Sequence, residues 1–156
     1  MVGRTLLNVL EERKFPYKDI YFVASKKSVG KKITYRSEPH FIISIEEIVE
    51  KKIDLAFFSA GTKISKKWAP ILADKGCKVI DNSSYWRMSP KHKLIIPEIN
   101  FYALSGKDMI IANPNCSTIQ LLMILSPIHK KYNIERVVVS TYQSVTGTGA
   151  RALQQL

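Results

Sequence analysis

The chain has 156 residues, of which 46% are hydrophobic and 24% are charged, and its formal net charge is +11. This length and composition suit one globular domain with its own core, and they exclude a chain that is disordered, collagen-like or coiled coil throughout. The excess of Lys and Arg is compatible with nucleic-acid binding or with attraction of phosphorylated small molecules. Because the lysines occur as scattered pairs and form no basic tail, we expect no nucleic-acid partner.

The expected cellular setting is a reducing cytoplasm. No uncharged apolar run approaches the roughly 18 residues that a membrane-spanning helix needs, so we expect no membrane partner. The first residues carry acidic side chains and no small-residue cleavage site, which disfavours a secretory signal. The two cysteines, Cys77 and Cys116, form no metal-type CxxC pair. We therefore expect neither a disulfide framework nor a metal site.

Segments typical of helices alternate with segments typical of strands along the chain. In chain order, the pattern predicts a helix at 3–13, a strand at 20–24, a polar loop at 25–40, a strand at 41–43, a helix at 45–52, a strand at 55–58, a helix at 62–75, a strand at 77–80, a polar segment at 81–93, a strand at 109–112, a helix at 116–131 and a strand at 137–142. Gly76 is expected to end the third helix, because a left-handed cap suits glycine.

The alternation of strand, turn and helix predicts an α/β fold with a Rossmann-like, doubly wound and mostly parallel sheet. The chain shows no internal repeat and no low-complexity linker. We expect one domain over residues 1–132 and the start of a second, α+β domain over residues 133–156.

Cys116 is the first candidate for chemistry. It follows Asn113-Pro114-Asn115 at the expected carboxyl end of a strand and opens a helix. Ligands of open α/β sheets bind beyond the carboxyl ends of the strands, and the positive end of a helix dipole stabilises a thiolate, the nucleophilic form of cysteine. The alternative is a buried cysteine that acts as a small hydrophobic residue. We favour that alternative for Cys77, which opens a strand.

Three other polar residues, Asn115, Gln143 and Arg87, each allow two interpretations. Asn115 either steadies an oxyanion or phosphate or caps a helix, and Gln143 either faces the same sheet edge as Cys116 or simply ends a strand. Arg87 either clamps a phosphate with two parallel hydrogen bonds or is a solvated loop residue. Lys27 and Ser28 follow the strand at 20–24, where a doubly wound fold places the group that reads an adenosine ribose. A positive charge there suits a 2′-phosphate.

Five motifs together resemble one family. They are ANPNCST around Cys116, STYQSVTGTG around Gln143, DNSSYWRM around Arg87, PEIN at 97–100 and ASKKSVGKKI at 24–33. In this order and spacing they resemble aspartate-β-semialdehyde dehydrogenase over essentially the whole chain. The NPNCST block is fairly specific, since the related acylglutamyl-phosphate reductases usually carry glycine before the cysteine.

The resemblance implies a reaction and a set of roles. Cys116 would attack β-aspartyl phosphate, expel phosphate and form a thioester, which hydride from NADPH reduces to aspartate semialdehyde. This reaction feeds lysine, threonine, methionine and diaminopimelate biosynthesis. Asn115 and Arg87 would belong to the phosphate site, and Gln143 would position the substrate.

The resemblance also implies NADP(H) as cofactor and a homodimer as the assembly. Residues 1–132 would form the NADP-binding domain, and residues 133–156 would begin the catalytic and dimerisation domain. Lys27 stands where many relatives have arginine, which keeps the charge but loses the planar fork. The residues that match cofactor-contacting positions are Val2, Gly3, Lys27, Ser28, Thr146 and Gly147.

Two departures from the family pattern stand at the ends of the chain. Family members begin with a strand and a GATGxVG turn, of which only Val2-Gly3 is found here. Their acid/base histidine, substrate-binding arginine, phosphate-site lysine and main dimer surface would follow the last residue of this chain. We therefore expect the chain alone to fold marginally and to turn over little. The alternative function is a catalytically inactive NADP-binding or interaction remnant of the same fold, which the presence of Cys116, Arg87 and Gln143 disfavours.

Overall fold

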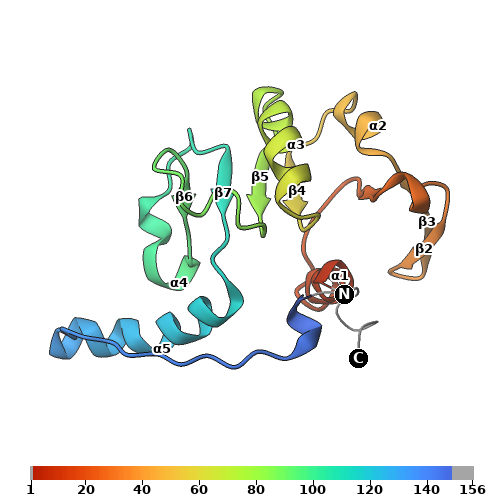
Figure 1. Ribbon diagram of the computed structural model, residues 1–156. Coiled ribbons are helices and arrows are strands. Elements are labelled where there is room, and N and C mark those ends of the chain that lie inside the picture. The colour runs from red at the N-terminus through yellow and green to blue at the C-terminus, as the bar shows by residue number, and fades with distance from the viewer. Residues whose placement is uncertain (1, 149–156) are drawn as a thin grey trace.

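The computed structural model describes residues 2–148, shown in Figure 1. The helices in that range are α1 (Val2–Glu12), α2 (Ile45–Val49), α3 (Thr62–Asp74), α4 (Pro97–Asn100) and α5 (Cys116–Tyr132). The 3-10 turns are η1 (Lys26–Ser28), η2 (Phe101–Ala103) and η3 (Val145–Thr148). The strands are β1 (Phe22–Val23), β2 (Lys32–Tyr35), β3 (Glu38–Ile43), β4 (Leu55–Phe58), β5 (Lys78–Asp81), β6 (Lys93–Leu94) and β7 (Ile110–Ala112).

The strands form two sheets. The larger sheet has the order β4-β5-β7-β6, and all of its neighbouring strands are parallel. The smaller sheet has the order β1-β3-β2, in which β1 runs parallel and β2 antiparallel to β3. The predicted α/β class with a parallel sheet is confirmed. Within the described residues the two sheets are separate, because no strand among them pairs with both β1 and β4.

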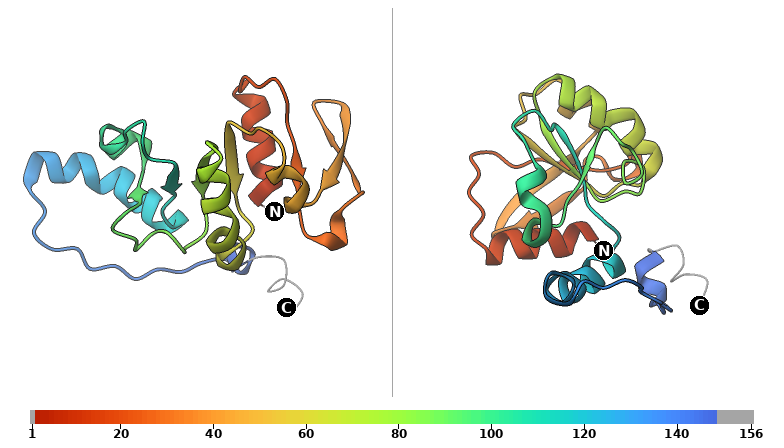
Figure 2. Two further views of the ribbon diagram at one scale, coloured as in Figure 1. Left: turned by 90° about the horizontal axis from the view of Figure 1, so that it is seen from above. Right: turned by 90° about the vertical axis from the view of Figure 1, so that its left-hand side faces the viewer.

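The hydrophobic core lies between α3 and the larger sheet. Figure 2 shows α3 along one face of that sheet. Leu72 and Ala69 lie on the buried face of α3, and they cluster with Val79 of β5 and Ile110 of β7. Full burial of one such aliphatic side chain contributes about 1.5–3 kcal/mol. This layer therefore supplies the rigid frame on which the strand ends are held.

Local capping signals set the ends of two helices. Gly76 has φ +88°, and its N–H donates to Ala73 O at 2.9 Å, so the predicted stop of α3 is confirmed. α2 begins with a capping box, in which Glu47 N donates to Ser44 Oγ at 3.2 Å and Ser44 N donates to Glu47 Oε1 at 3.1 Å. The backbone hydrogen bond from Ser44, followed by its side-chain bond, holds the pKa of Glu47 below its ordinary value.

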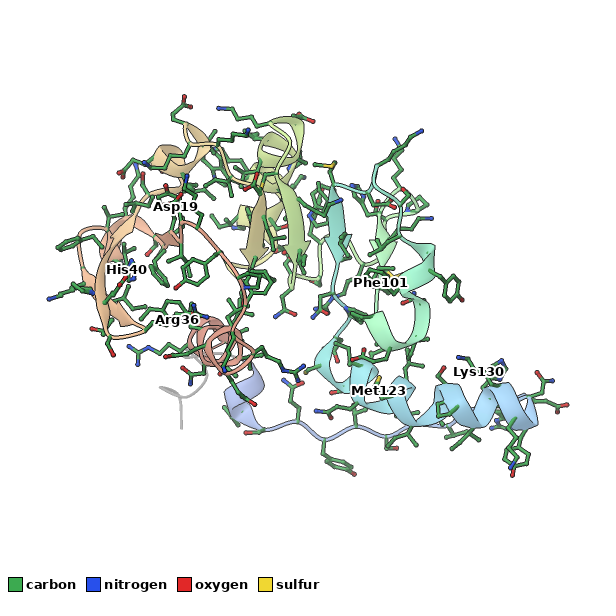
Figure 3. The ribbon with its side chains drawn as sticks, turned by 180° about the vertical axis from the view of Figure 1, so that it is seen from behind. Asp19, Arg36, His40, Phe101, Met123 and Lys130 are labelled. Atoms are coloured by element: carbon green, nitrogen blue, oxygen red, sulfur yellow. The ribbon has the colours of Figure 1, made fainter. Side chains whose placement is uncertain are left out.

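The prediction of a polar loop over residues 25–40 is wrong. The segment contains η1 and most of an antiparallel hairpin, β2–β3, whose turn residues Arg36 and Ser37 have φ +49° and +64°. Two successive left-handed residues make a primed hairpin turn, which usually carries Asn-Gly. Arg36 (Figure 3) also joins the hairpin to α1 and to the segment that follows α1, since Arg36 Nη2 lies 3.4 Å from both Leu10 O and Phe15 O.

The predicted strand at 137–142 is absent as well. These residues are extended and exposed, with Val138 78% and Tyr142 98% accessible. A strand needs a neighbour for its N–H and C=O groups, and no described strand pairs with this segment. α5, which precedes it, has no buried residue and extends away from the sheet (Figures 1 and 2). No helix within residues 2–148 combines the length and the apolar character needed to cross a membrane.

Candidate active site at the carboxyl edge of the parallel sheet

The carboxyl ends of β4, β5 and β7 are joined at one level by the residues that follow them. Asn82 N donates to Phe58 O at 2.8 Å, and Asn113 N donates to Asp81 O at 2.8 Å. The two asparagine side chains are also linked, since Asn113 Nδ2 donates to Asn82 Oδ1 at 2.8 Å. The backbone ladder therefore continues one residue past the strands and holds both loops in register.

Arg87 bridges these two loops. Its Nε donates to Asn113 O at 2.9 Å, and its Nη2 donates to Asn82 O at 3.0 Å. The side chain is half-buried and is no freely solvated loop residue. A guanidinium has five N–H groups, and two of them make these bonds within the described residues. The Arg87 side chain therefore ties the loop after β5 to the loop after β7.

Cys116 lies close to this bridge along the chain. It is the first residue of α5 and is exposed, and it follows Asn113 by three residues. Asn115 is the helix cap, because its Oδ1 accepts a hydrogen bond from Ser117 N at 3.0 Å. Capping uses the oxygen of this amide and leaves its Nδ2 group as a donor. The structure thus places the thiol at the start of a helix, as predicted from the strand–turn–helix pattern.

Cys77 has the opposite environment. Its residue is 1% accessible and lies in the core cluster behind α3. Burial, and then the nearby Asp54 carboxylate, raise the pKa of Cys77 to about 11. Such a thiol is almost entirely protonated near neutral pH and does not act as a nucleophile. The prediction that Cys77 is a small core residue is confirmed.

Lys27 and Ser28 lie in η1, directly after β1. The turn is closed by Ser28 N, which donates to Ser25 O at 2.8 Å, and the Lys27 side chain is exposed. This places both residues beyond the carboxyl end of β1, the position expected for the group that reads a ribose.

The remaining predicted residues lie at the start of α1 and at η3. Val2 and Gly3 are in the first turn of α1, and Thr146 and Gly147 are in η3. Figures 1 and 2 show η3, the blue turn at the end of the described chain, beside the start of α1. Gln143 does not end a strand. Its Nε2 lies 2.5 Å from where a Cβ on Gly147 would be, so the two residues are close neighbours in this turn.

Comparison with known proteins places the chain in a family. Residues 1–107 match the family described as semialdehyde dehydrogenase, NAD binding domain. The chain belongs to the semialdehyde dehydrogenase family. The resemblance to aspartate-β-semialdehyde dehydrogenase inferred from the motifs is thereby confirmed, together with a nucleotide-binding domain.

Individual members of the semialdehyde dehydrogenase family align over nearly all of this chain. Aspartate-semialdehyde dehydrogenase of Aquifex aeolicus (strain VF5) is 50% identical over 158 residues, which is 99% of this chain and 46% of that protein. The structure of aspartate semialdehyde dehydrogenase II from Vibrio cholerae is 42% identical with a TM-score of 0.91, and covers 99% of this chain and 47% of its own. A structure of the Vibrio enzyme complexed with ASA has 42% identity and a TM-score of 0.80, over 86% and 45% of the two chains. The chain thus spans slightly under half the length of these semialdehyde dehydrogenases.

Sequence reasoning missed a buried polar network beneath the Arg87 loop. Asp81 is fully buried at the end of β5, and it bonds to Ser65 of α3 and to Ser83. The sequence pattern places Asp81 in a polar segment, because DNSS has the composition of a turn. A useful signal was available in the same residues, since Asp and Ser next to a strand end often bond to their own backbone neighbours. The partner Ser65, sixteen residues away, had no such signal.

Proposed function

We propose that this chain carries the nucleophile and the phosphate site of an NADPH-dependent, phosphorylating aspartate-semialdehyde dehydrogenase. The observation that carries the proposal is the Arg87 bridge beside the turn into α5, where Arg87 Nε bonds to Asn113 O at 2.9 Å and Cys116 is exposed. A cation and a thiol at the carboxyl edge of a parallel sheet suit attack on an acyl phosphate. The Vibrio enzyme complexed with ASA supports the substrate class.

In the proposed first step, Cys116 Sγ attacks the acyl carbon of β-aspartyl phosphate. A C–S bond forms, the C–O bond to phosphate breaks, phosphate leaves with that electron pair, and the thiol proton passes to solvent or a base. Arg87 pairs with the phosphate oxygens, whose planar recognition suits a guanidinium. Asn115 Nδ2 and the first N–H groups of α5 stabilise the oxyanion that develops on the acyl oxygen. Gln143 is proposed to orient the substrate.

The residues expected to hold the cofactor fit a phosphorylated dinucleotide. Gly3 lies in the first turn of α1 with no atom within 4 Å of where a Cβ would be, which leaves open space beside a helix N-terminus. Val2 lies in the same turn of α1, η3 with Thr146 and Gly147 lies beside it (Figures 1 and 2), and Lys27 with Ser28 supplies a positive charge after β1. When bound, NADPH supplies the hydride that reduces the thioester to the aldehyde. Lys27 favours NADP over NAD, because a 2′-phosphate pairs with its charge.

The wider setting is part of the same proposal. We place the enzyme in the cytoplasm, as a homodimer, in the biosynthesis of lysine, threonine, methionine and diaminopimelate. The groups of the second half-reaction are assigned to parts of the family outside this chain. The groups proposed to form the thioester, Cys116 with Asn115 and Arg87, all lie within the described residues.

Acylation of Cys116 tests the proposal, because this step needs only residues of the chain. The chain is mixed with β-aspartyl phosphate without NADPH, and its peptides are analysed by mass spectrometry while released phosphate is measured. We expect one acyl adduct on Cys116, a matching amount of phosphate, and no adduct on Cys77. Cys116→Ser provides the control that lacks the thioester. A folded chain that stays unmodified at Cys116 would contradict the proposal and favour an inactive remnant.

A further inference from the structure

A buried polar network lies directly under the loop that carries Arg87. The carboxyl group of Asp81 is fully buried and accepts three hydrogen bonds: Ser65 Oγ and Ser83 Oγ donate to Oδ2 at 2.7 and 2.6 Å, and Ser83 N donates to Oδ1 at 3.0 Å. Ser65 Oγ in turn accepts from Trp86 Nε1 at 2.7 Å. The network therefore joins α3, the end of β5 and both ends of the Ser83–Trp86 segment.

The network fixes the residue that precedes Arg87. Besides its bond to Ser65, Trp86 packs against the core cluster. The centroid of its ring lies 4.4 Å from that of His92 and 4.7 Å from that of Tyr85. Tyr85 N also donates to Ser83 Oγ at 3.3 Å. A side chain held at this many points keeps one backbone position, so the Cα of the next residue is held too.

Arg87 extends from this anchor back over the strand ends. Its two bonds go to Asn82 O, the first residue after β5, and to Asn113 O, the first residue after the neighbouring strand β7. Asn82 is itself the residue between Asp81 and Ser83, so the network also sets the position of one of the two carbonyl acceptors. The backbone position of Arg87 and the position of Asn82 O, which accepts one of its bonds, therefore both depend on the buried Asp81 carboxyl group.

We infer that Asp81, with Ser83 and Ser65, is a positioning residue that aims the Arg87 guanidinium at the phosphate beside Cys116. This inference rests on the proposed function, because it assumes that Arg87 binds the phosphate. Asp81 acts through two hydroxyl donors and one N–H donor, so its role requires an acceptor on both carboxyl oxygens. An asparagine of the same shape places an NH₂ group against one set of donors and leaves hydrogen bonds unmade.

The test measures binding of inorganic phosphate to the whole chain by ³¹P NMR titration, with circular dichroism to confirm folding. Asp81→Asn and Ser83→Ala are expected to raise the phosphate Kd about fivefold, the equivalent of roughly one lost hydrogen bond. Ser83→Thr, which keeps the hydroxyl, is expected to restore the wild-type Kd. Ser105→Ala is the matched control, because Ser105 also bonds a loop carboxylate, Asp108, at 2.8 Å but on an exposed turn.

Three results would separate the possibilities. A phosphate Kd within twofold of wild type in folded Asp81→Asn and Ser83→Ala, with a raised Kd in Arg87→Met, would overturn the positioning role and leave the phosphate site standing. Failure of Ser83→Thr to restore binding would also count against it, since a hydroxyl would then not be the requirement. An unchanged Kd in Arg87→Met would overturn the proposed phosphate site and this inference with it. The Ser83 pair keeps the test valid should Asp81→Asn fail to fold.

Discussion

The two long helices outside α1 differ in what they face. α3 has 13 residues and buries Ser65, Ala69 and Leu72 against the larger sheet, whereas α5 has 17 residues and buries none. α5 also carries exposed apolar side chains, among them Met123 and Ile124, and is followed by an exposed apolar segment (Figure 3). The comparison teaches that apolar content alone does not bury a helix. A facing sheet is needed, and of these two helices it is α3 that packs on one.

Truncation of a core residue should break the α3 layer. Leu72 is 3% accessible, so Leu72→Ala is expected to lower the free energy of unfolding by about 2–5 kcal/mol through lost burial and a cavity. The matched change on α5 is Ile124→Ala, at a residue 65% accessible, which is expected to cost less than about 0.5 kcal/mol. Urea unfolding of both variants checks the contrast. Equal losses would mean that α5 is packed as firmly as α3.

Alkaline pH should weaken the same layer through Cys77. Its pKa is raised from 9.0 to about 11 in the folded state, so the unfolded chain releases its proton first. The contribution to stability is present below pH 9 and is lost as pH rises towards 11, by up to about 2 kcal/mol. Denaturant melts of wild type and Cys77→Ala across this range measure it. The difference between them should shrink with rising pH, while Cys116→Ser should follow wild type; parallel curves for Cys77→Ala and wild type would contradict the prediction.

A substitution at Gly76, where α3 ends, is expected to change the free energy of unfolding by a smaller amount. Gly76 has φ +88°, a conformation that costs a residue with a Cβ roughly 1–2 kcal/mol, although no atom lies within 4 Å of the added Cβ. Gly76→Ala is therefore expected to lower the free energy of unfolding by about 1 kcal/mol for backbone reasons alone. Gly106→Ala is the control, since Gly106 has equal space and no positive φ. Thermal or urea unfolding that showed no difference between the two would remove the strain argument.

Much of the larger sheet could be predicted from sequence, and the reasons are local. Apolar runs such as LAFF and the glycine stop at Gly76 depend on residues close by in the sequence. The β2–β3 hairpin was missed because its Arg36-Ser37 turn lacks the usual Asn-Gly signal. The segment 137–142 has strand composition, but pairing depends on a neighbour that composition does not reveal.

In the candidate site, too, the features set by local sequence could be predicted and the contacts between distant residues could not. The position of Cys116 at a helix start follows from the order of strand, turn and helix, and the capping role of Asn115 was one of its two readings. The bond from Arg87 to Asn82 O spans only five positions. The bond from Arg87 to Asn113 O joins residues 26 positions apart, and the bond from Ser65 to Asp81 joins residues 16 positions apart. Such contacts arise from tertiary packing and leave no local pattern in the sequence.

The most direct test of the account asks whether Arg87 and Cys116 share one anion site. Iodoacetamide, an uncharged reagent, is allowed to alkylate the chain with and without inorganic phosphate, and the Cys116 peptide is followed by mass spectrometry with Cys77 as the internal reference. The account predicts that phosphate slows alkylation of Cys116 severalfold in wild type and has no effect in Arg87→Met, while Cys77 stays unmodified in both. Alkylation of Cys116 that is indifferent to phosphate in wild type, or equally slowed in Arg87→Met, would contradict it.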